Sequence, residues 1–392
     1  MRRILSITGT RADYGLMRPV HRAIAADGGL ELHLVVTGMH LLPEFATSLA
    51  EVRAEAFGTL HEASMLLGED SGKAMAQSLG LGLVAIAGIV QSVRPDVILL
   101  QGDRGEMLAG AIAGAHMNVP VVHMSGGDFS GSIDDSIRNS ISKFAHFHLT
   151  TCEASTRRLL AMGEDAARIV EAGEPALDLL RTMTYMSRAD LAAELALDAA
   201  MPIAVATLHP VTDEAALAAG QMTTTLEALA DVGLQTVFTY PNADHGGRAM
   251  RDVLESWRGR PFLRIVANLG SHRYLSLLRQ AAVLVGNSSS GILEAPSFKL
   301  PVVNIGSRQH GRLRASNVID VGFDRAAIAA AMRAALDDPQ FRTRLADCRN
   351  PYGDGHTAER TVDVLRRLAL DPALTAKWRD GAGPFLARAD GA

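Results

Sequence analysis

Four carboxylates in the first half of the chain have the residue type and spacing of a proton-transfer centre. Each follows a short apolar run or opens a helical pattern: Asp103, Asp128, Asp134 and Asp135. A carboxylate held near cationic side chains can take a proton from a substrate atom or return one. Asp134 and Asp135 also precede Ser136-Ile137-Arg138. We therefore expect one of the two to cap a helix and the other to face a substrate.

Arginines in several loops predict a cationic site for an anion. Four of them follow apolar runs: Arg11, Arg104, Arg308 and Arg312. The planar guanidinium donates two parallel hydrogen bonds and therefore suits a diphosphate. A single loop arginine is ordinarily solvated surface, but four at one rim favour a cationic cleft.

Residues 286–291, GNSSSG, give a second indication of phosphate binding. Small residues let the backbone approach an anion, and a helix after them offers free N–H groups. Ser288 and Ser289 add hydroxyl donors, although serine is also a common helix cap. Glu294, one turn later, either accepts from ribose hydroxyls or is a solvated helix residue. His209 either pairs with a phosphate, moves a proton, or is a hydrogen-bonded structural residue.

Composition excludes several classes of protein. The chain has 392 residues, 48% of them hydrophobic and 21% charged, which is typical of a globular protein of about two domains. The net charge of -5 argues against a broad basic surface, so we expect no nucleic-acid partner. The two cysteines, Cys152 and Cys348, exclude a disulfide framework and favour a reducing cytoplasm. No HExxH, paired-cysteine, GxGxxG or P-loop motif occurs, so we expect no metal and no cofactor.

The sequence also predicts no membrane segment. The longest apolar stretch, residues 79–90, is interrupted by glycine and is shorter than the ~18 residues that a spanning helix needs. We expect it to form a buried helix of a cytoplasmic protein.

Short apolar, β-branched runs must position these side chains. In the first half they are residues 4–8, 32–37, 97–102, 120–124, 147–152 and 168–173. In the second half they are residues 202–209, 236–242, 262–269, 283–289, 301–306 and 317–322. Runs of this kind are typical of strands buried on both faces of a parallel sheet, and helical stretches such as 213–230 and 325–337 separate them. The pattern predicts an α/β protein of two doubly wound, Rossmann-like domains facing a cleft.

The same pattern suggests three segments. We expect residues 1–182 to form an N-terminal α/β domain with the catalytic side, and residues 183–370 a C-terminal α/β domain that binds the nucleotide. Residues 371–392 would be a tail with a loose end, since they are polar and punctuated by Gly and Pro. Ligands of such folds bind at the carboxyl ends of the strands, where the polar residues described above occur.

Six collinear motifs resemble one enzyme family. They are TGTRADYG, TGMHLLPEF, QGDRGEMLAGAIAG, HMSGGDFSGSIDDSIRNSISKFAHFH, YPNADHGG and GNSSSGILEAPSFKLPVVNIGSRQHGR. The chain from residue 4 to about residue 368 is similar to the hydrolysing UDP-N-acetylglucosamine 2-epimerases. These enzymes supply N-acetylmannosamine or a related sugar for the synthesis of sialic-acid-type nonulosonates, and their two-domain architecture is called GT-B.

The resemblance implies roles for matching positions. Arg11 and His209 would contact the diphosphate, Ser288 and Ser289 would cradle it, and Glu294 would hold the ribose. The resulting candidates for catalysis are Asp103, Asp128, Asp134, Arg138 and His209. The candidates for substrate binding are Arg11, Asp13, His40, Arg104, Ser125, Asn242, His272, Ser288, Ser289, Glu294 and Arg308.

Ser125 departs from the pattern of the family. Many members carry a glutamate at this position, two residues after a strand histidine, and that glutamate is thought to act in proton transfer. Serine is no general base by itself. Either Asp128 or Asp103 serves instead, or the 4- or 6-position of the sugar differs and the pocket has been rebuilt.

The sequence therefore predicts a hydrolysing epimerase acting on UDP-N-acetylglucosamine or a UDP-linked relative. Its partner would be the nucleotide sugar, and we expect a homo-oligomer. Two alternatives are a GT-B glycosyltransferase, which would need an acceptor, and a non-catalytic nucleotide-sugar-binding protein, which would bind UDP without releasing any.

Overall fold

The computed structural model describes residues 1–69, 71–129, 133–242, 244–377 and 385. The chain divides into two compact units, the first made of Met1–Leu179 with Tyr352–Ala392 and the second of Leu180–Pro351. The expected boundary near residue 182 agrees with this division. The end of the chain does not: residues 352–370 were expected in the second domain, but they belong to the first unit.

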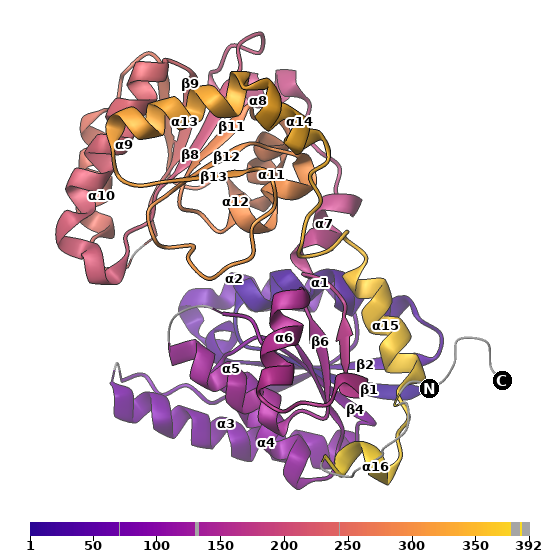
Figure 1. The fold of residues 1–392 in the computed structure, drawn as a ribbon. Coiled ribbons are helices and arrows are strands. Elements are labelled where there is room, and N and C mark those ends of the chain that lie inside the picture. The colour runs from indigo at the N-terminus through magenta and orange to yellow at the C-terminus, as the bar shows by residue number, and fades with distance from the viewer. Residues whose placement is uncertain (70, 130–132, 243, 378–384, 386–392) are drawn as a thin grey trace. The chain divides into compact units, whose positions relative to one another are not determined.

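The first unit contains a parallel sheet of seven strands (Figure 1). The strands are β1 (Arg2–Thr8), β2 (Leu30–Thr37), β3 (Thr59–Ala63), β4 (Val97–Gln101), β5 (Val121–Met124), β6 (Phe147–Thr150) and β7 (Ile169–Glu171). Their order is β3-β2-β1-β4-β5-β6-β7, so the winding reverses between β1 and β4. Ligands of open α/β sheets bind at this switch point.

Helices cover both faces of this sheet. They are α1 (Arg11–Ala26), α2 (Ala46–Glu55), α3 (Gly72–Val93), α4 (Gly105–His116), α5 (Ile133–Phe144), α6 (Glu153–Ala161), α7 (Ala176–Thr182), α15 (Thr357–Arg367) and α16 (Pro372–Thr375). Short 3₁₀ turns are η1 (Gly38–Leu41), η2 (Pro43–Phe45) and η3 (Ala166–Arg168). The helices α3, α4 and α5 share one apolar cluster with the sheet, and α1 and α15 share another. The two faces therefore have separate cores, as a doubly wound sheet requires.

Apolar residues late in the chain explain why residues 352–370 join the first unit. Ala358, Val364 and Leu365 of α15 lie in the same buried cluster as Val20 and Ile24 of α1. In Figure 1, the yellow α15 lies beside the indigo α1. The sequence pattern shows that α15 is amphipathic, but it does not say which sheet the apolar face covers.

The carboxylate of Asp178 on α7 fixes the start of α15. Its two oxygens accept from the backbone N–H groups of Thr357, at 2.9 Å, and Ala358, at 2.7 Å. These N–H groups have no partner within their own helix. The contact therefore caps α15 from a residue almost 180 positions earlier in the chain.

The second unit repeats the architecture with a six-stranded parallel sheet. Its strands are β8 (Ile203–Thr207), β9 (Gln235–Thr239), β10 (Leu263–Val266), β11 (Val283–Gly286), β12 (Val302–Ile305) and β13 (Val318–Val321), in the order β10-β9-β8-β11-β12-β13. Its helices are α8 (Arg188–Leu195), α9 (Ala218–Val232), α10 (Gly247–Ser256), α11 (Gly270–Gln280), α12 (Ser290–Leu293), α13 (Arg325–Asp337) and α14 (Pro339–Ala346), with the 3₁₀ turns η4 (Thr212–Leu217) and η5 (Ala295–Phe298). The winding reverses between β8 and β11.

The predicted α/β class and all twelve predicted strands are confirmed. The sequence missed β3, the edge strand of the first sheet, because its TLHEA sequence is short, half polar and mostly solvent-accessible. The cleft between the domains stays a prediction.

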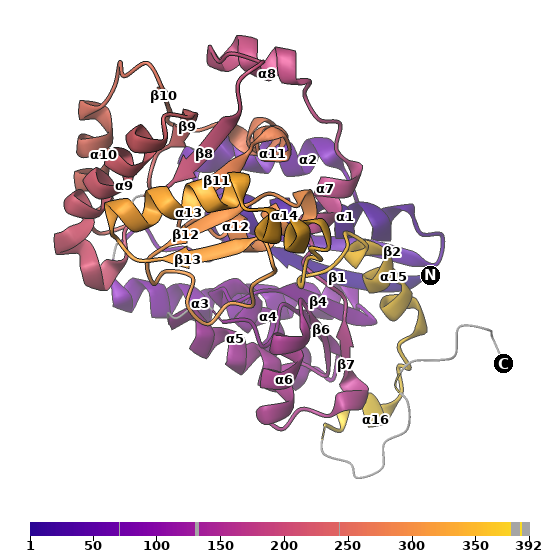
Figure 2. The same cartoon turned by 45° about the horizontal axis from the view of Figure 1, so that its top comes forward.

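The helix α3 differs from its prediction. Residues 79–90 were expected to be buried, but α3 packs along α4 on the surface of the first unit (Figure 2) and exposes Met75, Leu81 and Val84. By length and composition alone, α3 is apolar enough to cross a membrane. Its buried residues Ile86 and Val90 belong to the core of the unit, as in the surface helix of a domain.

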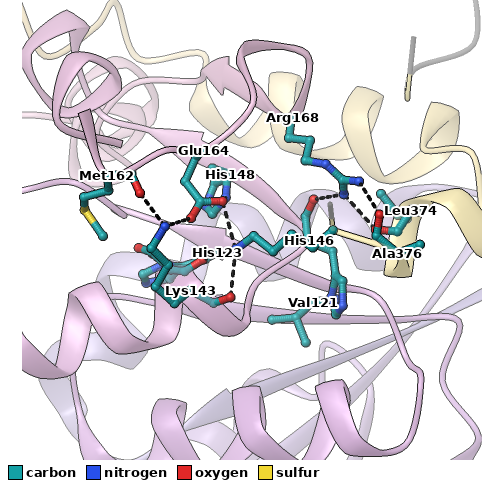
Figure 3. Close-up of polar contacts among 12 residues, drawn as sticks. Val121, His123, Lys143, His146, His148, Met162, Glu164, Arg168, Leu374 and Ala376 are labelled. Carbon is teal, nitrogen blue, oxygen red and sulfur yellow. Dashed lines mark hydrogen bonds and ion pairs between the residues drawn. The ribbon is translucent and has the colours of Figure 1, made fainter. Parts of the chain in front are cut away.

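Residues 371–377, which we call the strap, pack against the first unit (Figure 3). The buried Arg168 donates to the carbonyl oxygens of Leu374, at 2.7 Å, and Ala373, at 3.1 Å. Lys377 Nζ lies 2.8 Å from the buried carboxylate of Glu164. The predicted looseness of the tail concerns residues 378–384 and 386–392, which lie outside the described residues.

Candidate active site

Asp103 lies at the switch point of the first sheet, immediately after β4. The strand ends at Gln101, and the next residue, Gly102, turns the chain out of the sheet with a φ of +78°. Asp103 Oδ2 accepts from Nη2 of Arg138 on α5. Arg138 is only 6% exposed, and its Nη1 also donates to Asp135 Oδ1, at 2.6 Å, and to the carbonyl oxygen of Asp128, at 2.9 Å. One guanidinium thus joins the ends of two strands to a helix.

Asp134 provides a second carboxylate close to Asp103. Asp134 and Asp135 both lie in the first turn of α5, where the helix dipole favours negative charge. We expected one of them to be the helix cap, but both lie within α5. The residue that precedes α5 lies outside the described residues. Burial raises the pKa of Asp103, Arg138 lowers it in part, and the charge of Asp134 raises it further. A carboxyl group with a raised pKa is suited to giving and taking a proton near neutral pH.

Asp128 is engaged in a different task. Its Oδ1 accepts from the hydroxyls of Thr151, at 2.6 Å, and Ser155, at 2.5 Å. Both hydroxyls lie at the start of α6, so the carboxylate fastens the loop after β5 to that helix. This geometry favours a supporting role for Asp128 and leaves Asp103 and Asp134 as the carboxylates at the switch point.

Ser125 offers no base, as its residue type predicts. It lies buried after β5 in the left-handed region, with φ of +61°. The amide of Gln101 donates to the Ser125 hydroxyl at 2.9 Å. The two neutral side chains satisfy each other, and neither titrates near neutral pH.

The two arginines expected in the cationic site of the first unit each lie next to a glutamate of the same unit. Arg11, the first residue of α1, is 76% exposed and pairs with Glu51 at 3.2 Å. Arg104 lies 3.4 Å from the buried carboxylate of Glu106. The sequence analysis missed Glu106, because a glutamate in the first turn of a helix gives no signal that it is buried at a sheet edge.

Asp13 and His40 support the loop after β1 rather than lining an open surface. Asp13 is buried and forms a capping box with Thr10 at the start of α1. Thr8 Oγ1 donates to Asp13 and lies 3.0 Å from His40 Nε2. His40 Nδ1 lies 2.7 Å from the hydroxyl of Ser48, and His40 is 1% exposed. Both side chains therefore hold this loop, and the prediction that they bind substrate stays a prediction.

In the second unit, the ends of β8 and β11 meet at the corresponding switch point. The side chain of Asn287 bonds to the backbone of His209 in both directions, accepting from its N–H at 2.7 Å and donating to its carbonyl at 2.8 Å. Gly286 is required here, since a Cβ at this position would lie 1.9 Å from the carbonyl oxygen of Thr207. The first glycine of GNSSSG therefore serves strand packing.

His209 is neutral in this site. Its Nδ1 accepts from the backbone N–H of Asn242 at 3.0 Å, so the ring proton is on Nε2. Burial, with a smaller effect of Arg308, lowers the pKa of His209 to about 4. Of the two roles predicted for a phosphate contact, the geometry favours a neutral N–H donor over an imidazolium.

A pocket of about 320 Å³ lies beside this histidine. It is lined by Thr207, His209, Thr239, Tyr240, Ala267, Asn268, Leu269, Gly270, Ser271, Tyr274, Ser288 and Ser290. Tyr274 is near the hydroxyls of Ser288 and Ser290, and burial raises its pKa. Most of the lining residues carry hydroxyl, amide or imidazole groups, which suits a polar ligand with many hydrogen-bonding groups.

Glu294 and Arg308 lie near this pocket with part of their bonding capacity unused. Glu294 Oε2 is buried and has no hydrogen-bond partner among the described residues, and burial raises the pKa of its carboxyl. Arg308 donates to the carbonyl of Asn287 at 3.2 Å, and burial, with a smaller effect of the nearby charge of Arg312, lowers its pKa. A buried oxygen without a partner costs free energy unless a ligand or water satisfies it.

Three predictions for this unit need adjustment. The helix after GNSSSG, α12, is only four residues long and passes into η5, so its dipole is small. Ser288 and Ser290 line the pocket, whereas Ser289 does not. His272 also lies outside the lining and contacts the carbonyl of Thr184 at 2.8 Å. Sequence reasoning missed Tyr274, since a tyrosine at helical spacing is indistinguishable from a core residue.

No group of three or more histidine, cysteine or acidic residues with the geometry of a metal site occurs among the described residues. Cys152 and Cys348 are free thiols, and both are buried.

Comparisons with known proteins identify a family for this chain. The family model described as UDP-N-acetylglucosamine 2-epimerase matches residues 22–366. A UDP-N,N'-diacetylbacillosamine 2-epimerase (hydrolyzing) of Legionella pneumophila is 38% identical over 96% of this chain and 99% of its own. A UDP-N-acetylglucosamine 2-epimerase of Neisseria meningitidis is 34% identical over 93% of this chain and 95% of its own.

Solved structures match in fold. The UDP-GlcNAc 2-epimerase from Neisseria meningitidis, bound to UDP-GlcNAc, aligns with a TM-score of 0.74 at 17% identity, over 93% of this chain and 99% of that one. The enzyme from Methanocaldococcus jannaschii gives a TM-score of 0.74 at 17% identity with the same coverage. The two Rossmann-like units are therefore of the GT-B type.

Proposed function

We propose that this chain, a UDP-sugar 2-epimerase that belongs to the UDP-N-acetylglucosamine 2-epimerase family, is a hydrolysing enzyme. It would convert a UDP-linked 2-acetamido sugar and water into the free 2-epimeric sugar and UDP. The relatives from Legionella and Campylobacter, at 38% and 36% identity, both carry the word hydrolyzing in their names.

We propose UDP-N,N'-diacetylbacillosamine as the preferred sugar substrate and UDP-N-acetylglucosamine as the alternative. The first is the substrate in the names of the Legionella and Campylobacter relatives, and the second in that of the 34% identical Neisseria relative. The two sugars differ at C4 and C6. Ser125, bonded to Gln101, is smaller than a glutamate and supports a pocket adapted to a different substituent there. The product would serve the synthesis of nonulosonates of the sialic or legionaminic acid type.

The arrangement of the first unit supports an elimination mechanism. The C1–O bond breaks and its electron pair leaves on the β-phosphate oxygen of UDP, while a carboxylate takes the C2 proton. The product of this step is a glycal. Water then adds at C1, and an acid returns a proton to the opposite face of C2. In this proposal Asp103 and Asp134 serve as the acid and base pair, which the contact of Asp103 with Arg138 and its raised pKa support.

The second unit would hold the nucleotide in this mechanism. The Nε2–H of neutral His209, with Arg308 beside it, would donate to the departing diphosphate. Glu294 Oε2 would accept from the ribose hydroxyls, which would satisfy this buried oxygen.

One observation carries the proposal: Asp103, with a raised pKa, is held by buried Arg138 next to Asp134 at the switch point of the sheet. Carboxylates whose environments shift their pKa values mark candidate acid and base groups.

The test is incubation of the pure protein with each UDP-sugar in heavy water. We expect equal amounts of UDP and free 2-epimeric sugar, with deuterium at C2. Product without C2 deuterium would reject the elimination. UDP release that requires an added acceptor would indicate a glycosyltransferase, and UDP binding without any release would indicate a binding protein.

We further propose that the chain is a cytoplasmic homo-oligomer that uses α3 as a contact surface. This helix carries no charged residue from Ala74 to Val93, yet Met75 and Val84 are 64% and 75% exposed. Exposed apolar surface of this kind is typical of protein contacts. Val84→Glu should have a lower molecular mass in solution than the unchanged protein, as measured by light scattering. An unchanged mass would exclude α3 as the contact, and flotation with liposomes would indicate a membrane instead.

A further inference from the structure

His123 is a buried histidine of the first unit that the proposed reaction does not use. It lies on β5, is fully buried, and pairs in register with Leu100 of β4 and His148 of β6. Figure 3 shows it between the strands and the end of α5. Both of its ring nitrogens have partners, Nε2 with the carbonyl oxygen of Gly102 at 2.7 Å and Nδ1 with the hydroxyl of Ser142 at 3.0 Å.

The partners fix the protonation state of His123. A carbonyl oxygen only accepts, so Nε2 carries the proton and Nδ1 accepts from the Ser142 hydroxyl. Burial lowers the pKa of His123 to about 3, and the ring is therefore neutral at neutral pH. A neutral ring with both nitrogens occupied cannot transfer protons to a substrate, but it can hold two elements at a fixed separation.

The two elements that His123 joins carry the two halves of the Asp103–Arg138 ion pair. Gly102 directly precedes Asp103, and Ser142 lies one helical turn after Arg138 on α5. The contact is tightly enclosed, since a Cβ on Gly126 would lie 3.0 Å from His123 Nδ1 and 3.0 Å from Ser142 Oγ. Movement of either element would therefore change the position of Asp103 relative to Arg138.

The end of α5 is also held independently of His123. Lys377 Nζ donates to the carbonyl oxygens of Ser142, at 2.9 Å, and Lys143, at 2.7 Å. Lys143 Nζ in turn lies 2.9 Å from Glu164 (Figure 3). Because these contacts fasten α5 to the unit, loss of the imidazole should leave the helix in place and release mainly the turn at Gly102.

We propose that His123 is a positioning residue, which sets the location of the Asp103 carboxylate by holding the Gly102 carbonyl against α5. The inference rests on the proposed role of Asp103 in proton transfer. Misplacement of a reacting group by about 1 Å can cost about 100-fold in rate. The effect should appear in kcat, because the hydrogen-bond partners of His123 belong to the first unit and the proposed nucleotide pocket belongs to the second.

Two amide substitutions separate the two hydrogen bonds of His123. The amide of His123→Gln reaches the position of Nε2 and can still donate to Gly102, whereas that of His123→Asn reaches only the position of Nδ1 and Ser142. We expect His123→Asn to lower kcat by about 100-fold and His123→Gln by less than about 10-fold, with KM and the Kd for UDP unchanged in both. His148→Gln is the matched control, since His148 is equally buried and pairs with His123 across the sheet.

Hydrogen exchange of the peptide around residues 100–107 tests the same inference without activity. Exchange should be faster in His123→Asn than in His123→Gln or His148→Gln, while peptides of the second unit stay unchanged. If the two His123 variants and His148→Gln lose kcat alike and exchange alike, His123 is merely structural and the inference is wrong. If the unchanged protein releases no UDP from either UDP-sugar, the proposed function fails, and the exchange data still decide whether His123 holds the turn.

Discussion

The two switch points differ in whether their buried acceptor oxygens already have a partner within the protein. In the first unit, Arg138 bonds to two carboxylates, and the hydroxyl of Ser125 bonds to an amide. In the second unit, Glu294 Oε2 and Asn242 Oδ1 are buried and have no hydrogen-bond partner among the described residues. The first site is organised before a ligand arrives, and the second offers acceptors that a ligand can satisfy.

This difference suggests a division between chemistry and binding. Groups fixed in advance near the reacting atoms lower a barrier because they need no reorganisation during the reaction. Groups that lack a partner gain hydrogen bonds on binding and therefore contribute to affinity. Substitutions in the first unit should change turnover, and substitutions in the second should change affinity.

The largest expected effect is the loss of turnover in Asp103→Asn. Removal of an acid or base group lowers kcat by about 100-fold or more, and we expect the same for Asp134→Asn. The Kd for UDP, measured by calorimetry, should stay within about twofold, because the proposed nucleotide contacts belong to the second unit. Asp128→Asn is the matched control: with its contacts to Thr151 and Ser155, it should lower thermal stability and keep most of the turnover. Full activity of both Asp103→Asn and Asp134→Asn would remove the carboxylate assignment.

The next largest effect is expected on UDP affinity. A hydrogen bond to a charged group is worth about 1.5–3 kcal/mol, so Glu294→Ala should raise the Kd for UDP by about 10- to 150-fold. Ser288→Ala should weaken binding to a smaller extent. Ser289→Ala is the control, since Ser289 does not line the pocket, and it should bind nearly as well as the unchanged protein. Equal losses for the two serine variants would show that the pocket is not the diphosphate site.

Acid should weaken the first unit more than the second. Burial lowers the pKa of His21 and His123 to about 3 and that of His146 to about 4, whereas an unfolded histidine titrates near 6.5. Below about pH 6.5 these histidines become protonated in the unfolded chain but stay neutral in the folded unit. The free energy of unfolding therefore falls as the pH decreases toward about 3. His209, with its pKa lowered to about 4, is the corresponding group of the second unit. Hydrogen exchange at about pH 7.5 and about pH 5, corrected for intrinsic rates, should show the larger loss of protection in the first unit.

The smallest expected effect is that of Lys377→Gln in the strap. The glutamine amide can still donate to a carbonyl oxygen at the end of α5, where Lys377 contacts Ser142 and Lys143, and Glu164 would keep its contacts with Lys143 and His148. The loss should therefore be about 1 kcal/mol, equivalent to about 2–4 °C in the melting temperature of a unit of this size. Turnover should change less than threefold. A large fall in kcat without a change in melting temperature would mean that the strap, too, sets the position of Asp103.

The sequence predicted what depends on local pattern. Buried parallel strands appear as continuous apolar runs, and polar residues directly after them must meet at one edge of the sheet. This logic found Asp103 and His209, whereas the role of Arg138, which lies within a helix, was implied only by the resemblance to the family. It could not find Glu106 or Tyr274, whose importance comes from burial beside residues distant in sequence. It also assigned α15 to the wrong unit, because an amphipathic helix shows that it has a partner but does not identify it.

The first unit is built from two chain segments, one before and one after the second unit in the sequence, and this order matters during synthesis. The ribosome releases the six strands of the second sheet before it releases α15, whose Val364 and Leu365 complete the apolar core beside α1. The second unit can therefore finish folding while the first still exposes part of its core. A nascent chain stalled before residue 352 would leave that apolar surface uncovered. Chaperones and proteases that bind exposed apolar surface would then act on the stalled chain in preference to a chain that contains α15.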